Sequence, residues 1–96
     1  MNIGLVGLGK MGGAIYNRLR SKGFGVQVYD PDANAYTKQQ IPAHDRHASL
    51  EDLVNALVTP RCIWIMVPAG VATVDVSTAL LDLLSQGDIV IDGGNS

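Results

Sequence analysis

The 96-residue sequence contains a single cysteine, few aromatic residues and no cluster of basic side chains. One cysteine cannot form an intrachain disulfide, so Cys62 is compatible with a reducing compartment. The seven lysines and arginines are scattered among nine acidic residues, and the net charge is -2. Such a chain lacks the basic surface to which nucleic acids or anionic membranes bind. No apolar run reaches the roughly 18–20 residues of a membrane span, and the N-terminal segment lacks the charged start of a signal peptide. These absences favour a cytoplasmic protein that binds neither nucleic acid nor membrane.

The composition is that of one small globular domain. Hydrophobic residues make up 47% of the chain and charged residues 17%, and the length leaves no room for a second domain. We therefore treat residues 1–96 as one domain.

Strand-like and helix-like patterns alternate along the chain. Short apolar runs predict buried strands at 3–6, 26–29, 62–67 and 89–91. Helical spacing predicts helices at 10–22, at 34–40, from the N-cap Ser49 to a stop at Pro60, and at 71–84. The segment 43–48 is less clear, and a short edge strand is one alternative. This order predicts an α/β fold with a doubly wound, mostly parallel sheet of the Rossmann type. We expect the sheet to be truncated after about its fifth strand.

The strongest motif is a glycine-rich loop that follows the first predicted strand and opens the first predicted helix. It comprises Gly7-Leu8-Gly9-Lys10-Met11-Gly12, and we expect these six residues to bind a dinucleotide. Gly7 permits the tight turn, Gly9 lets a pyrophosphate approach the backbone, and Gly12 lets the helix pack against the strand. The free N–H groups and the dipole of the helix then favour the anion. The alternatives are a glycine-rich turn without a ligand and, for Lys10, a solvated side chain.

An acidic residue stands where such a site needs one. Asp30 ends the second predicted strand, roughly 20 residues after the loop, where a carboxylate accepts hydrogen bonds from the adenosine ribose. The same carboxylate would repel a 2′-phosphate by roughly 4 kcal/mol at 4 Å and an effective dielectric of 20. Its neighbours Pro31 and Asp32 supply no cation, and Asp32 is expected to cap a helix. The sequence therefore favours NAD over NADP.

Four segments carry a resemblance to a known family. They are Gly7–Gly12, Pro60-Arg61, Met66-Val67-Pro68-Ala69-Gly70 and Asp92-Gly93-Gly94-Asn95-Ser96. Together they resemble 6-phosphogluconate dehydrogenase, over essentially the whole chain but over only the N-terminal part of such an enzyme. The closing segment is the most specific of the four. The related β-hydroxyacid dehydrogenases share the loop and fold but usually carry a different sequence after this strand.

The resemblance implies an NAD(P)-dependent oxidative decarboxylation of 6-phosphogluconate, a phosphorylated sugar acid, to ribulose 5-phosphate. By the family pattern Val67, Pro68 and Ala69 lie against the nicotinamide end of the cofactor. The residues that would bind the substrate are Gly93, Gly94, Asn95 and Ser96, and Asn95 would also contact the cofactor. The common NADP-dependent members carry an Asn-Arg-Thr-like run where this chain has Asp30-Pro31-Asp32, which favours the NAD-preferring branch.

The same resemblance places no catalytic residue in this chain. The family's lysine base and glutamate acid, and the helical domain through which it forms homo-oligomers, lie beyond Ser96. The ending directly after a strand is typical of a truncation, so we expect this fragment alone to bind cofactor without turnover. Two alternatives stay open: the cofactor domain of a β-hydroxyacid dehydrogenase, and a nucleotide-sensing module without chemistry.

The remaining candidates for chemistry favour ordinary structural roles. His44 and His47 lie three residues apart, but no acidic or cysteine cluster completes a metal site, so we expect no metal. Cys62 and Trp64 lie in an apolar predicted strand, where packing is the expected role.

Overall fold

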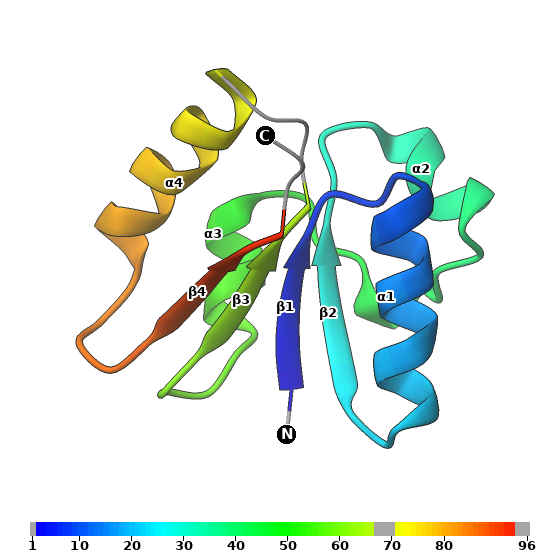
Figure 1. The fold of residues 1–96 in the computed structure, drawn as a ribbon, viewed down its shortest axis with the longest axis horizontal. Coiled ribbons are helices and arrows are strands. Elements are labelled where there is room, and N and C mark those ends of the chain that lie inside the picture. Colours follow the sequence, from blue (N-terminus) through cyan, green and yellow to red (C-terminus); the bar gives the residue numbers. More distant parts are fainter. Residues whose placement is uncertain (1, 67–70, 94–96) are drawn as a thin grey trace.

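The computed structural model of the chain describes residues 2–66 and 71–93, with side chains left out at 71–74. Its strands are β1 (Asn2–Val6), β2 (Gly25–Tyr29), β3 (Cys62–Ile65) and β4 (Ile89–Asp92). They form one sheet in the order β2-β1-β3-β4, and every neighbouring pair is parallel. The four arrows in Figure 1 accordingly point the same way. The expected α/β class with a parallel sheet is confirmed.

Helical segments connect these strands. They are α1 (Lys10–Ser21), α2 (Ala33–Lys38), the 3₁₀ turn η1 (Ala43–Asp45), α3 (Leu50–Asn55) and α4 (Val71–Leu83). Within the described part of the chain, no helix is long and apolar enough to cross a membrane.

The sheet is covered on both faces, because successive side chains of a strand point to opposite sides. In β1, Leu5 belongs to a buried cluster with Tyr16 of α1. The next residue, Val6, belongs to a second cluster with Leu53 of α3 and Leu80 of α4. Helices therefore pack on the two faces separately, as the doubly wound arrangement requires (Figure 1).

The helix ends follow the signals in the sequence. Gly23 follows α1 with φ of 91°, a left-handed conformation that favours glycine. The side chain of Ser49 accepts a hydrogen bond from the Asp52 N–H at 3.0 Å, and Asp32 caps α2 by accepting from the Asn34 N–H at 3.0 Å. Both expected N-caps are thus confirmed.

One alternative and one expectation about strands were wrong. The segment 43–48 forms η1 and a single bridge between Val28 and Arg46, not an edge strand. The 3₁₀ turn follows Pro42. Its Asp45 side chain is buried and accepts a hydrogen bond from the Tyr16 hydroxyl at 2.6 Å. The described sheet therefore has four strands and not five.

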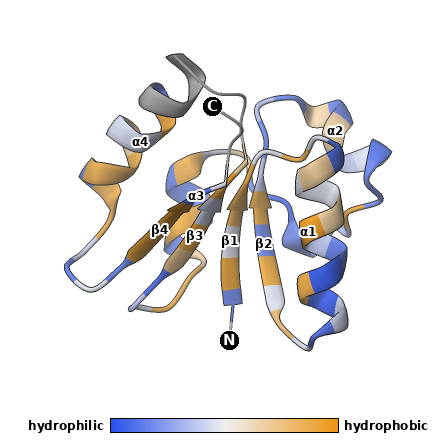
Figure 2. Ribbon diagram, viewed as in Figure 1, coloured by the Kyte–Doolittle hydropathy of each residue, from blue (hydrophilic) through white to orange (hydrophobic). Residues whose placement is uncertain are grey.

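The other wrong expectation concerns β4, which was expected to be buried. Its apolar side chains are exposed to 58% at Ile89, 41% at Val90 and 39% at Ile91, and Figure 2 shows this strand as one of the most apolar parts of the chain. Within the described residues, the strand lies at the edge of the sheet and pairs with β3 alone. Neighbouring β3 is likewise covered less evenly than expected, with Ile63 and Ile65 fully buried but Trp64 half-buried.

Asp88 joins the starts of β3 and β4. Its carboxylate accepts hydrogen bonds from the Arg61 N–H at 2.6 Å and the Ser85 N–H at 2.8 Å, and the Arg61 guanidinium lies 3.1 Å away. The Arg61 and Ser85 backbone bonds, with the guanidinium, hold the pKa of Asp88 below its ordinary value of 3.8. The folded protein thus favours the ionised carboxylate.

A carboxylate whose pKa is lowered by folding stabilises the fold above its unfolded pKa and loses that contribution as the pH falls through the folded one. We therefore expect the melting temperature of the wild type to decrease as the pH is lowered below 3.8. Asp88→Asn should melt lower than wild type at neutral pH and show a smaller drop on acidification. The control is Asp82→Asn, at an exposed position of α4. Equal acid sensitivity in wild type and Asp88→Asn would contradict this role.

Candidate functional site

The carboxyl ends of the parallel strands meet at one edge of the sheet. Backbone hydrogen bonds continue the pairing just past the strands: the Gly7 N–H donates to Tyr29 O at 2.9 Å, the Met66 N–H to Val6 O at 2.7 Å, and the Gly93 N–H to Ile65 O at 2.9 Å. Open α/β sheets bind their ligands at this edge. The predicted site segments therefore start side by side at one edge of the sheet.

Two glycines of the loop between β1 and α1 are required by the protein's own geometry. Gly7 has φ of 97°, which other residues rarely adopt. A Cβ on Gly12 would overlap the Gly7 carbonyl oxygen, at less than the 3.0 Å that real Cβ atoms keep. The first turn of α1 thus lies directly on the loop, as expected for a glycine that allows close helix packing.

Gly9 differs from these two glycines. Its φ of -43° lies outside the left-handed region that favours glycine, and within the described residues a Cβ there would meet nothing within 4 Å. No contact within the described residues therefore requires a glycine at this position. A ligand backed closely against the loop would require it, because a side chain would occupy the ligand's space.

Within the described residues, no side chain caps the N-terminus of α1. Gly9 is its N-cap and provides no side-chain acceptor, and the first turn contains no acidic residue. The first N–H groups of a helix lack intrahelical partners, and the helix dipole adds partial positive charge there. An anion such as a pyrophosphate supplies both the acceptors and the negative charge. The residues present therefore fit a dinucleotide.

Asp30 connects the end of β2 to this loop. Its Oδ2 accepts a hydrogen bond from the Leu8 N–H at 2.7 Å, and its Oδ1 accepts one from the Asp32 N–H at 2.8 Å. An ionised carboxylate has about four lone-pair sites, so two remain after these bonds. Asp30 is half-buried.

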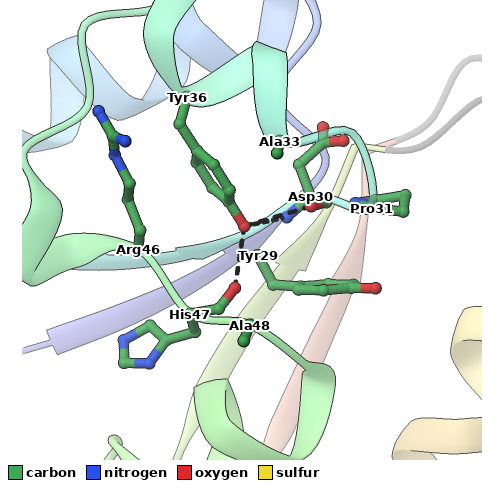
Figure 3. Close-up of a pocket in the computed structure, with 8 residues that line it drawn as sticks. All are labelled: Tyr29, Asp30, Pro31, Ala33, Tyr36, Arg46, His47 and Ala48. Carbon is green, nitrogen blue, oxygen red and sulfur yellow. Dashed lines mark hydrogen bonds between the residues drawn. The ribbon is translucent and has the colours of Figure 1, made fainter.

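A hollow of about 530 Å³ opens beside Asp30. Figure 3 shows Tyr36 at its centre, between Arg46 on one side and Asp30 with Pro31 on the other. The remaining residues that line it are Tyr29, Ala33, His47 and Ala48. This hollow was not predicted from the sequence, because the segment 46–48 is far from β2 in sequence and carries no motif.

The other predicted site residues fall into three groups. Lys10 and Met11 are exposed at the start of α1, with Met11 exposed to 61%. Leu8 has a fully buried side chain in the core, and its N–H is already bonded to Asp30. The predictions for Val67, Pro68, Ala69, Gly94, Asn95 and Ser96 fall on residues outside the described ones.

Gly93 directly follows β4, and it has a packing role that the sequence did not predict. A Cβ on it would overlap the indole nitrogen of Trp64 and crowd the sulfur of Met66. The Trp64 indole N–H is buried and has no hydrogen-bond partner within the described structure. Trp64 packs against the buried cluster on the α1 face, which agrees with its expected packing role.

The two histidines contribute to a polar network around Asp45 and not to a metal cluster. His47 Nε2 lies 2.5 Å from Gln27 Oε1, and Gln27 Nε2 lies 3.4 Å from Asp45 Oδ1. Burial, with the hydrogen bond to Asp45, raises the pKa of Tyr16 to about 12. Within the described ranges, no group of three or more histidine, cysteine or acidic residues is placed to hold a metal ion.

Residues 2–96 match the family model described as the NAD binding domain of 6-phosphogluconate dehydrogenase. The chain belongs to this family. The expected resemblance is thereby confirmed, and the cofactor domain of a 6-phosphogluconate dehydrogenase is supported over the two alternatives.

Individual relatives agree with the family. The chain is 41% identical over 100 residues to 6-phosphogluconate dehydrogenase, decarboxylating, from Chlamydia pneumoniae, and 40% identical over 100 residues to the NAD(+)-dependent, decarboxylating enzyme from Bacillus subtilis. Each match covers 99% of this chain and 21% of the relative. The structure of Plasmodium falciparum 6-phosphogluconate dehydrogenase, known with NADP+ and with 6-phosphogluconate, superimposes with a TM-score of 0.88 at 31% identity, covering 100% of this chain and 22% of that one. The chain thus spans about a fifth of the length of these relatives.

Proposed function

We propose that this chain is the cofactor-binding part of an NAD-preferring, decarboxylating 6-phosphogluconate dehydrogenase. The observation that carries the proposal is Gly9, a glycine whose absent side chain leaves open space at the uncapped start of α1. The pyrophosphate of NAD would lie there, held by backbone N–H groups of the first helical turn. Lys10 and Met11 are exposed at the same helix start and would flank it.

The preference for NAD is proposed from Asp30. The two free lone-pair sites of its carboxylate would accept hydrogen bonds from the adenosine ribose hydroxyls. A 2′-phosphate in the same place would meet a negative charge, and Pro31 supplies no cation to offset it. An NAD(+)-dependent relative at 40% identity supports this proposal, whereas the Plasmodium enzyme is known with NADP+.

The contribution of this chain to the reaction is binding and orientation. When bound, NAD would supply the hydride acceptor for oxidation of the sugar acid. The loop at Gly9 and the carboxylate of Asp30 would fix the adenosine and pyrophosphate parts. By the family pattern, Val67, Pro68 and Ala69 would lie along the nicotinamide, and Gly93, Gly94, Asn95 and Ser96 along the substrate. A base and an acid from the rest of the enzyme would complete the site.

Gly9→Ala tests the proposed pyrophosphate site. The added methyl group meets no atom of the described residues within 4 Å, so we expect the melting temperature of the full-length protein to stay at the wild-type value. The methyl group would stand between the loop and the pyrophosphate, so the affinity for NAD should fall at least about tenfold, or 1.4 kcal/mol. Calorimetric titration measures the affinity, and thermal unfolding provides the control. Unchanged NAD affinity in a folded Gly9→Ala protein would remove the loop from the binding site.

A further inference from the structure

We infer that Tyr36 is a positioning residue for cofactor recognition, which acts by fixing Asp30 for its contact with the ribose. The inference rests on the proposed function of Asp30. Tyr36 belongs to α2 and is 8% exposed. Its hydroxyl oxygen accepts a hydrogen bond from the Asp30 N–H at 2.9 Å, and its O–H donates to the His47 carbonyl oxygen at 2.9 Å (Figure 3). One phenol therefore joins the end of β2 to the segment after η1.

Three hydrogen bonds fix the position of Asp30. The Leu8 N–H fixes Oδ2, the Asp32 N–H fixes Oδ1, and Tyr36 fixes the peptide nitrogen. The first two bonds orient the carboxylate, and the third fixes the backbone that carries it. Recognition of a diol by a carboxylate depends on such prior orientation, because disorder in the free protein lowers affinity.

The phenol of Tyr36 is itself held in place. The guanidinium carbon of Arg46 lies 5.5 Å from the centre of the Tyr36 ring, and Arg46 Nε donates to the Ile41 carbonyl oxygen at 2.8 Å. Burial raises the pKa of the Tyr36 hydroxyl, so the group stays protonated and keeps its donor at neutral pH.

Removing this hydroxyl should disturb Asp30 without removing the ring. Tyr36→Phe would leave the Asp30 N–H and the His47 carbonyl without their partner, while the ring could still pack against Arg46. A loss of binding free energy equal to the net contribution of one hydrogen bond corresponds to about a three- to tenfold change in affinity. We expect KM for NAD to rise about three- to tenfold, with kcat unchanged because Tyr36 would act on the adenosine end of the cofactor, where no bond is made or broken.

The experiment uses the full-length protein and two cofactors, NAD and an NAD analogue whose adenosine ribose lacks both hydroxyls. If Tyr36 acts through Asp30, Tyr36→Phe raises KM for NAD but not for the analogue. In an Asp30→Ala background, Tyr36→Phe should then have no further effect on KM for NAD. Tyr16→Phe is the matched control: it also loses a buried tyrosine hydrogen bond, to Asp45, and should leave the ratio of the two KM values at the wild-type value.

Two results would overturn the inference, and they can be told apart. Equal increases in KM for NAD and the analogue in Tyr36→Phe would show a general structural effect, with the role of Asp30 intact. Equal KM values for the two cofactors in the wild-type protein would instead show that Asp30 does not bind the ribose. In that case the proposed role of Asp30 fails, and the inference about Tyr36 fails with it.

Discussion

Gly12→Ala is expected to cause the largest loss of stability of any single methyl group added to the glycine loop. The new Cβ would overlap the carbonyl oxygen of Gly7, a backbone atom that cannot rotate away. Overpacking commonly costs about 1–3 kcal/mol and sometimes more, and a clash with backbone belongs to the upper end. A loss of about 3 kcal/mol would lower the melting temperature of a domain of this size by about 12–24 °C. Thermal unfolding followed by circular dichroism measures the change.

Two neighbouring glycines provide the controls. Gly13→Ala places its Cβ against the end of the Gln39 side chain, which can move aside, and alanine is favoured over glycine in a helix by about 1 kcal/mol. The Cβ of Gly9→Ala meets no atom within 4 Å in the part of the chain that the structure describes. Both variants should melt near the wild-type temperature. A Gly12→Ala protein that melts with them would contradict the close packing of α1 on the loop.

The double change of Asp30→Ala with Pro31→Arg is expected to shift cofactor preference from NAD toward NADP. Each hydrogen bond from a ribose hydroxyl to a carboxylate contributes about 1.5–3 kcal/mol, so NAD should lose about tenfold or more in affinity. Removing the repulsion of roughly 4 kcal/mol per charge pair, and adding a cation, should favour the 2′-phosphate. We expect the ratio of kcat/KM for NADP to that for NAD to rise at least about 100-fold.

Asp32→Asn is the control for this double change. It removes a negative charge two residues away but keeps an oxygen to accept the Asn34 N–H that caps α2. The preference for NAD should persist in this variant. If the double variant kept the wild-type cofactor ratio, Asp30 would have no part in discrimination, and its hydrogen bonds to Leu8 and Asp32 would be purely structural.

Much of this fold follows from short-range patterns in the sequence. Local spacing and local backbone geometry determine the strands β1, β2 and β3, the N-caps Ser49 and Asp32, and the glycine after α1. Burial was harder to predict, because it depends on what packs against a strand. Ile89, Val90 and Ile91 form an apolar run typical of a buried strand, yet they lie on an edge strand and are exposed.

The site was predictable where a motif fixes it and unpredictable where distant segments meet. Gly7, Gly9 and Gly12 have a fixed spacing, and Asp30 follows the next strand at the usual distance. Two hydrogen bonds join segments that share no motif. One runs from the Leu8 N–H to Asp30, and the other from the Tyr36 hydroxyl to the His47 carbonyl oxygen. Such contacts depend on the packing of α2 and of the segment 46–48 against β2, which no local pattern in the chain determines.

The central claim is that the glycine loop and Asp30 together form an NAD-preferring site in a 6-phosphogluconate dehydrogenase. Its most direct test is the rate of cofactor reduction by the full-length protein with saturating 6-phosphogluconate, measured with NAD and with NADP. We predict that kcat/KM is higher for NAD by at least about tenfold, in line with the roughly 4 kcal/mol by which Asp30 would repel a 2′-phosphate. A higher kcat/KM for NADP, or no reduction of either cofactor, would contradict it.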